Sequence, residues 1–285
     1  MGKPNIRFKG YTEDWEQRKL GDFGKATGGT SIESEFSEDG IYKVISIGSY
    51  SENSVYNDQG IRAIKSDKTS NRVLNRNDLT MILNDKTTSG NIIGRVLLIE
   101  ESGIYVYNQR TERIEINLDE YDPVFLYEML NAPNIREKII KQAQGNTQIY
   151  VNWTAISLLE YMIPSKEEQV KIGEYLHSIS NLITLHQRKY DETKKLKKCM
   201  LQKMFPKEGE KVPEIRFSGF TGDWKQRKFG DMVIIERGGS PRPIDKFITE
   251  DENGLSWVKI GDAPEQGNYI LSLIHISEPT RQAEI

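Results

Sequence analysis

The chain has 285 residues, of which 28% are charged and 36% hydrophobic, a balance typical of a folded protein rather than a disordered one. Its net charge of −3 and pI near 5.8 count against a histone-like protein that binds DNA through charge alone. The single cysteine, Cys199, excludes an intramolecular disulfide, and no apolar run approaches the length of a membrane span. We therefore expect a cytoplasmic chain, long enough for two domains and without a membrane segment.

One segment of the sequence occurs twice. The first copy, residues 4–22, reads PNIRFKGYTEDWEQRKLGD, and the second copy, residues 213–231, reads PEIRFSGFTGDWKQRKFGD. Thirteen positions are identical at a constant offset of 209, and a Gly-Gly pair follows each copy at Gly28-Gly29 and Gly238-Gly239. A period this long excludes a solenoid and indicates that one domain-plus-helix unit is used twice.

Between the first copy and residue 164 the pattern is mixed. Clusters of β-branched and apolar residues bounded by turn residues predict strands at residues 42–47, 78–83, 91–100 and 104–107. Helical spacing predicts helices at residues 123–130 and 134–144, which Ala132-Pro133 separates and Gly145 terminates. The predicted fold class is α+β: a domain of mixed sheet and helices, a long coiled-coil helix, and the start of a second copy of the domain.

The long helix is predicted at residues 165–206, a run without proline until Pro206. Ser165 and Glu168 have the spacing of a capping box, in which the hydroxyl accepts a free backbone N–H and the carboxylate reaches back. Steps of four and three residues predict a coiled-coil seam that packs against another helix; an ordinary core helix is the alternative. The residues assigned to helix packing and the subunit interface are Ile172, Leu176, Ile179, Ile183, Tyr190, Leu196 and Met200.

Several chemistries find no support in the sequence. Outside residues 271–285 the histidines are His177 and His186, both on the long predicted helix, which argues against a catalytic histidine or a multi-histidine metal site. Residues 24–30 contain Gly-Lys without the spacing of a phosphate-binding loop, and no G-x-G-x-x-G follows a strand. The Asn-Pro-Pro-aromatic motif of adenine methyltransferases is also missing. We expect no catalytic residue, no metal site and no cofactor, so an enzyme is the least favoured class.

Three polar clusters lie between the predicted elements. Amide, hydroxyl, ammonium and guanidinium groups of this kind can contact base edges or phosphates. Each cluster alone is more typical of a solvated turn, but three in one duplicated domain beside a long helix suit a bipartite DNA site with fixed spacing. The candidate DNA-binding residues are Asn84, Lys86, Thr87, Thr88, Asn91, Asn108, Gln109, Arg110, Asn146, Thr147 and Gln148.

The motifs resemble the specificity (S) subunit of type I restriction–modification systems over residues 3–270. The segments that carry the resemblance are the two copies of the repeat and residues 107–110, 145–148, 163–172, 196–205 and 257–262. The resemblance implies a non-catalytic reader of double-stranded DNA, each of whose target-recognition domains reads one half of a split site. The long helix would set the spacing and dock methyltransferase subunits, and through them the restriction subunit. Methyl transfer from S-adenosylmethionine and ATP-dependent cleavage would belong to those partners.

The resemblance also implies a domain organisation. The first target-recognition domain is expected at residues 1–164, the spacer helix at 165–206 and an incomplete second domain at 207–270. Residues 271–285 resemble a translated sequencing adapter and are expected to be non-native. Without a second helix in the chain, the long helix is expected to pair with that of another copy, giving a homodimer that reads a palindromic split site. The alternative function is a coiled-coil interaction scaffold that binds protein without DNA specificity.

Overall fold

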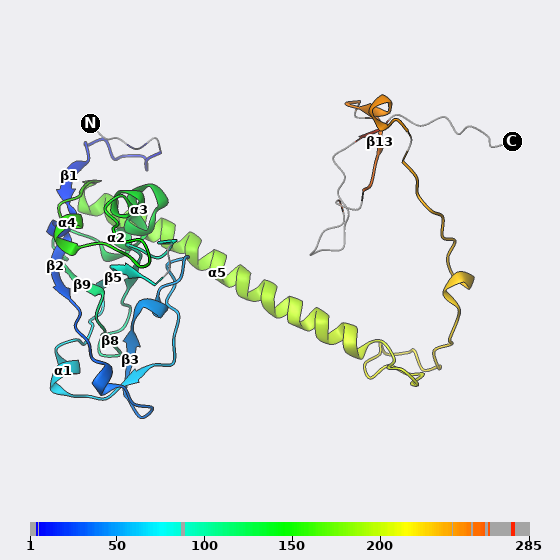
Figure 1. The fold of residues 1–285 in the computed structure, drawn as a ribbon, viewed down its shortest axis with the longest axis horizontal. Helices are drawn as coiled ribbons and strands as arrows, with labels where there is room; N and C mark the ends of the chain where they lie inside the picture. The colour runs from blue at the N-terminus through cyan, green and yellow to red at the C-terminus, as the bar shows by residue number, and fades with distance from the viewer. Residues whose placement is uncertain are drawn as a thin grey trace. The chain divides into compact units, whose positions relative to one another are not determined.

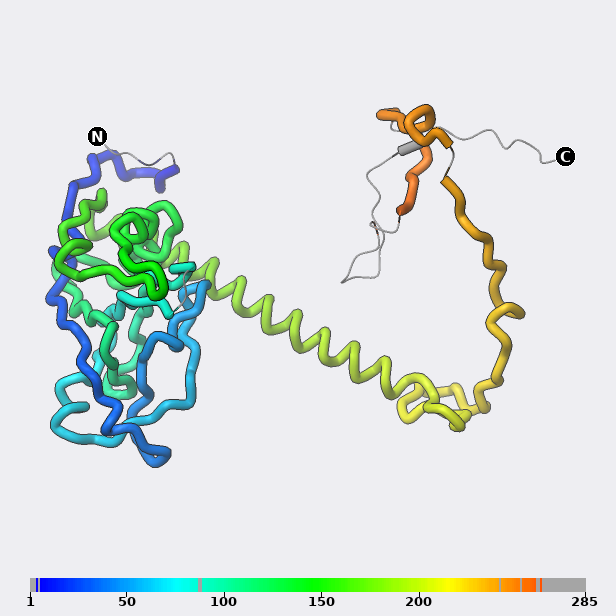
Figure 2. Tube along the Cα trace, in the orientation of Figure 1, coloured from blue at the N-terminus to red at the C-terminus, as the bar shows by residue number. Residues whose placement is uncertain are grey.

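The computed structural model describes residues 4, 6–86, 89–240, 242–251, 253–259, 262 and 275–276 of the chain. The chain divides into two compact units, Met1–Lys197 and Lys198–Ile285. The first unit is a mixed α and β head from which one long helix extends (Figures 1 and 2).

A four-stranded antiparallel sheet forms the centre of the head. Its order is β2-β9-β5-β7, with bounds Gly24–Gly28, Thr111–Ile116, Leu79–Ile82 and Val96–Leu98. Successive side chains of a strand point to opposite faces, and β5 is buried at every position. Leu79 and Met81 accordingly join one hydrophobic cluster and Ile82 another, so the sheet divides two parts of the core.

Two helices cover the larger cluster. Helix α2, Pro123–Asn131, begins where Asp122 Oδ1 accepts the Phe125 N–H at 2.7 Å, and α3 follows at Pro133–Ile140. Proline at the first position of both helices leaves no additional free N–H there. Strand β1, Glu16–Lys19, pairs antiparallel with β11, Glu160–Ile163, and closes this side of the core.

The head also contains a smaller three-stranded sheet of order β4-β3-β8. Strand β3, Tyr42–Ile45, runs parallel to β8, Tyr105–Tyr107, and antiparallel to β4, Arg62–Ala63. A two-stranded ladder joins β6, Asn84–Asp85, to β10, Ile149–Tyr150. The remaining short elements of the head are η1 Leu20–Phe23, η2 Glu33–Glu35, η3 Ile47–Ser49, α1 Asp67–Ser70 and α4 Trp153–Ile156.

The mixed α and β fold of the head agrees with the prediction, and most predicted strands and helices form near their expected bounds. The strand predicted at 91–100 is wrong over its first half, because only Val96–Leu98 forms β7. Gly94 lies there at φ 70°, in a turn that the Arg95 N–H closes by donating to the Ile92 carbonyl at 3.0 Å. Strand β9 was missed because its charged residues mask the pattern; Arg113 on β9 pairs with buried Asp78 at 2.9 Å.

Helix α5 covers Lys166–Lys203, 38 residues without interruption. At 1.5 Å per residue it is about 57 Å long. The predicted long helix is therefore confirmed. The part of α5 nearest the head contacts α2, where Ser180 Oγ donates to Glu128 Oε1 at 3.3 Å. Figure 1 shows the remainder of α5 leaving the head as a straight rod.

The second unit has short elements over its described residues. They are η4 Phe229–Asp231, η5 Ile244–Lys246, β12 Ile248–Thr249, β13 Leu255–Ser256 and β14 His275–Ile276. The strand order is β12-β14-β13, so β14, which falls in the segment expected to be non-native, pairs with both neighbours. The second copy of the repeat forms no strand, although each of its residues is described.

Candidate nucleic-acid interface

A cleft of about 330 Å³ brings parts of all three predicted polar clusters together. It is lined by Glu33, Phe36, Ser46, Ile47, Ile61, Lys86, Asn108, Gln109, Arg110 and Gln148. One cluster supplies Lys86, the second supplies Asn108 to Arg110, and the third supplies Gln148. The chain segments between them fold so that residues far apart in sequence share one cavity.

Arg110 is the cation at the tip of the β8–β9 connection. Its backbone lies in the left-handed region at φ 71°, and its carbonyl accepts the Leu83 N–H at 3.0 Å. The exposed guanidinium donates from Nη1 to Gln148 Oε1 at 3.3 Å. A strained backbone position anchored by a strand thus presents this guanidinium at the cleft.

Asn108 has a different setting from its two neighbours. It is buried, and its Oδ1 accepts the Ile32 N–H at 3.1 Å and the Gln109 N–H at 2.8 Å. The half-buried Gln109 donates from Nε2 to Glu33 Oε1 at 3.3 Å. Asn108 therefore holds the backbone from which Gln109 reaches the cleft.

The cluster at residues 84–91 is divided by the structure. Asn84 belongs to β6 and pairs with Tyr150, while Lys86 lines the cleft. Asn91 is exposed elsewhere and donates from Nδ2 to Glu52 Oε1 at 2.8 Å. Thr87 and Thr88 lie outside the described residues.

The cluster at residues 145–148 is a tight turn. Gly145 has φ 96°, and a Cβ at this position would lie 2.1 Å from the Gln148 carbonyl oxygen, so a side chain does not fit. Gln148 lines the cleft, whereas Asn146 and Thr147 are exposed and do not line it.

Two further residues near the cleft were not singled out from the sequence. Glu33 accepts the Gln109 amide, and Arg72 donates to the Gly28 carbonyl at 2.7 Å and to the Tyr107 hydroxyl at 3.0 Å. A Cβ on Gly29 would lie 2.0 Å from the Asn108 carbonyl oxygen. The Gly-Gly pair after each copy was the available signal, because it marks a close approach of two backbone segments.

A buried carboxyl group lies just after the β8–β9 connection that carries Arg110. Glu112 on β9 is 6% exposed, and burial raises its pKa to about 7, while the nearby charge of Arg72 acts in the opposite direction. The first residues of β9 thus place a group that titrates near neutrality next to the segment that carries Arg110.

The first copy of the repeat is tied to the start of α5. Arg7 donates from Nε and Nη2 to the two oxygens of Glu168, both at 2.7 Å, and the Glu168 side chain is fully buried. This hydrogen bonding raises the pKa of Arg7. Half of the predicted capping box forms, since Glu168 N–H donates to Ser165 Oγ at 3.4 Å, but the carboxylate binds Arg7 instead of reaching back.

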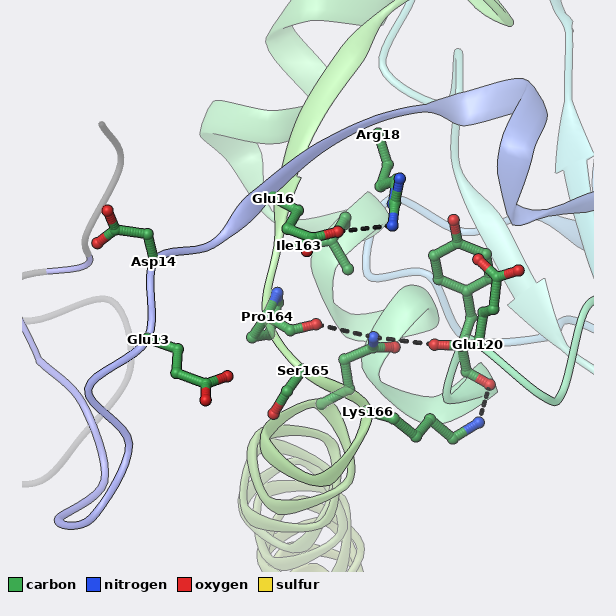
Figure 3. A pocket seen from close by; sticks show the side chains of 11 residues that line it. Glu13, Asp14, Glu16, Arg18, Glu120, Ile163, Pro164, Ser165 and Lys166 are labelled. Carbon is green, nitrogen blue, oxygen red and sulfur yellow. Dashed lines mark hydrogen bonds and ion pairs between the residues drawn. The ribbon is translucent and has the colours of Figure 1, made fainter.

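A second cavity, of about 190 Å³, lies at the same junction (Figure 3). Lys166 Nζ donates to the carbonyls of Leu118, at 2.7 Å, and Tyr121. Gln169 Nε2 donates to the Glu120 carbonyl at 3.2 Å, and Gln169 Oε1 accepts the Asp122 N–H at 2.9 Å. These bonds satisfy backbone groups where α2 begins, so the residues at the start of α5 anchor the helix to the head.

The predicted packing stripe on α5 has two parts. Ile172 packs against the core of the head. The residues beyond it are between 37% and 64% exposed, namely Leu176, Ile179, Ile183, Tyr190 and Leu196, and Met200 is half-buried. Over the described residues, α5 therefore carries a run of apolar side chains that the head leaves open.

Among the described residues, no group of three or more histidine, cysteine, aspartate or glutamate side chains is arranged to hold a metal ion. In the same part of the chain, no helix is both long and apolar enough to cross a membrane.

Residues 12–195 match the family model of the type I restriction modification DNA specificity domain. This match covers the head and most of α5, which is more than half of the chain. The chain therefore belongs to the family of type I restriction–modification DNA specificity domains.

The chain is also similar to individual proteins. The chain is 28% identical over 194 residues to the type I restriction enzyme MjaVIII specificity subunit of Methanocaldococcus jannaschii, covering 66% of this chain and 45% of that protein. The S subunit structure from M. genitalium is 20% identical, with a TM-score of 0.44 and coverage of 65% and 45%. The HsdS subunit from Thermoanaerobacter tengcongensis is 15% identical, with a TM-score of 0.45 and coverage of 72% and 47%. The chain spans less than half the length of these relatives.

Proposed function

We propose that this chain is the DNA-recognition component of a type I restriction–modification complex, and that its first unit reads one half of a bipartite site on double-stranded DNA. The observation that carries the proposal is the convergence of Lys86, Gln109, Arg110 and Gln148 on one cleft in a domain of this family. Arginine and lysine pair with guanine edges, and glutamine with adenine. The chain itself catalyses no reaction, and methyl transfer and ATP-dependent cleavage belong to partner subunits.

Helix α5 is the proposed spacer and docking element. Its exposed apolar stripe fits a second helix from another copy of this chain. Methyltransferase subunits then assemble on the paired helices, and the restriction subunit joins through them. The 38-residue length of the helix would set the distance between half-sites.

The experiment that tests DNA reading uses the full chain co-purified with its methyltransferase subunits and a randomised duplex library. We expect enrichment of a defined sequence, and Arg110→Ala should lower affinity about tenfold or more, as loss of a base-contacting arginine does. Its melting temperature should stay close to that of the unaltered chain. Arg76→Ala is the matched control, because Arg76 is an exposed arginine that does not line the cleft.

Two outcomes would count against DNA reading. If the complex with methyltransferase subunits binds DNA without sequence preference, the result would favour the alternative function, a coiled-coil scaffold that binds protein without DNA specificity. Unfolding of the Arg110→Ala chain would indicate that Arg110 stabilises the fold instead of contacting DNA.

The role of α5 is tested separately by Ile179→Asp. A carboxylate in the apolar stripe should abolish subunit assembly in size-exclusion chromatography, because its burial in a helix interface without a partner is unfavourable. Ser178→Asp, on an exposed neighbouring position off the stripe, is the control and should assemble normally. If the Ile179→Asp chain assembles normally, the apolar stripe of α5 is not the surface through which the subunits pack.

A further inference from the structure

Two arginines, Arg95 and Arg136, lie near enough for the charge of Arg95 to act on Arg136. Arg136 on α3 is 8% exposed and donates from Nη2 to the Asn91 carbonyl at 2.9 Å. Arg95, half-buried, donates from Nη1 to Ser54 Oγ at 2.9 Å. The Nε atom of each arginine is buried without a hydrogen-bond partner among the described residues.

The electrostatics of this pair are unfavourable. Burial lowers the pKa of Arg136, and the charge of Arg95 lowers it further. Burial also lowers the pKa of Arg95, against which Glu52 acts. Two like charges withdrawn from water, with unpaired donors, are destabilising unless an anion compensates them.

Glu52 is the carboxylate whose charge acts on both arginines. Its charge favours the charged forms of both arginines, yet its side chain is exposed and Oε1 accepts the Asn91 amide at 2.8 Å. No salt bridge joins Glu52 to either arginine within the part of the chain that the structure describes. The two arginines therefore have no ion-pair partner among the described residues, and Arg136 binds the carbonyl of Asn91, a candidate DNA-binding residue that lies outside the cleft.

We propose that Arg95 and Arg136 form an oxyanion site that takes a backbone phosphate of bound DNA, with Asn91 and Ser54 holding the two guanidinium groups in place. Glu52 partly offsets the charge of the empty site and is repelled when the phosphate enters. This inference rests on the proposed DNA-reading function for the identity of the ligand. It adds a contact that positions the duplex without reading its bases.

The first test uses inorganic phosphate and the full chain. Phosphate should raise the melting temperature above that in chloride at equal ionic strength, because a ligand that binds the native state stabilises it. Arg95→Gln should remove this difference, Glu52→Gln should enlarge it, and Arg76→Gln should leave it unchanged. Equal melting temperatures of the unaltered chain in phosphate and chloride would overturn the site.

The second test uses DNA and the complex with methyltransferase subunits. Arg95→Gln should make the slope of log K against log salt shallower by about one while keeping the preferred sequence, as expected for a lost phosphate contact. Glu52→Gln, which keeps both arginines, should raise affinity several-fold and guards against an arginine variant that fails to fold. An unchanged slope in folded Arg95→Gln, with sequence preference intact, would overturn this inference and leave the proposed function standing. Loss of all sequence preference in the unaltered complex would instead remove the proposed function, while the phosphate measurement would still report on the site.

Discussion

The two copies of the repeated segment differ in what surrounds them. In the first copy, residues 16–19 form β1 against β11, and Leu20 is fully buried in the core. In the second copy, residues 225–228 form no strand, and Phe229, which corresponds to Leu20, is 64% exposed. A two-stranded pairing needs a partner strand and a core face, and among the residues that the structure describes only the first copy has both.

The charged positions of the two copies differ in the same way. Arg7 forms a bidentate pair with buried Glu168, whereas its counterpart Arg216 donates to the Gly222 carbonyl at 2.6 Å. Phe8 makes an edge-to-face contact with Tyr175, whereas its counterpart Phe217 is 71% exposed. Identical residues therefore acquire roles only where the start of a long helix lies beside them. The first copy of the repeat therefore acts as a docking segment for the start of α5.

The largest difference between the copies is expected at the core position. Leu20→Ala should lower the free energy of unfolding of the first unit by about 3 kcal/mol, because a fully buried leucine loses apolar burial and leaves a cavity. Phe229→Ala should change it by less than about 0.5 kcal/mol, as for an exposed site. Urea unfolding of the full chain measures both values. Similar losses for the two variants would show that the second copy is also packed.

A smaller difference is expected at the arginine position. Arg7→Ala leaves the Glu168 carboxylate buried without its partner, so the melting temperature should fall by several degrees. Arg216→Ala is the matched variant and should leave the melting temperature unchanged. Thermal unfolding followed by circular dichroism measures both. Equal effects of the two substitutions would contradict the inference that Arg7 joins the first copy of the repeat to α5.

Much of the fold could be predicted because local patterns determine it. The long helix follows from apolar spacing without proline, and α2 and α3 follow from helical spacing that Ala132-Pro133 interrupts. Strand β9 escaped prediction because it is stabilised by tertiary contacts, such as the pairing of Arg113 with Asp78. Local propensity does not report such contacts.

The candidate site could be predicted only in outline. The three polar clusters could be found from composition, but their meeting at one cleft depends on strand pairings between distant segments. The burial of Asn108 and the turning of Asn91 toward Glu52 depend on the same tertiary arrangement. The Gly-Gly pair marked Glu33 and Arg72 only indirectly, and their roles follow from hydrogen bonds to residues far away in the sequence.

The smallest expected difference concerns the aromatic position. The rings of Phe8 and Tyr175 meet at a centroid distance of 5.7 Å and an interplanar angle of 87°, a favourable edge-to-face geometry. A double-mutant cycle of Phe8→Ala and Tyr175→Ala should give a coupling energy of about 1 kcal/mol, because each substitution removes the same contact. The parallel cycle of Phe217→Ala and Tyr175→Ala should give none if the first copy alone occupies this position on α5. A coupling energy for Phe217 equal to that for Phe8 would mean that the two copies compete for the start of α5. The copies would then differ in how often each occupies that position and not in the contacts that each can make there.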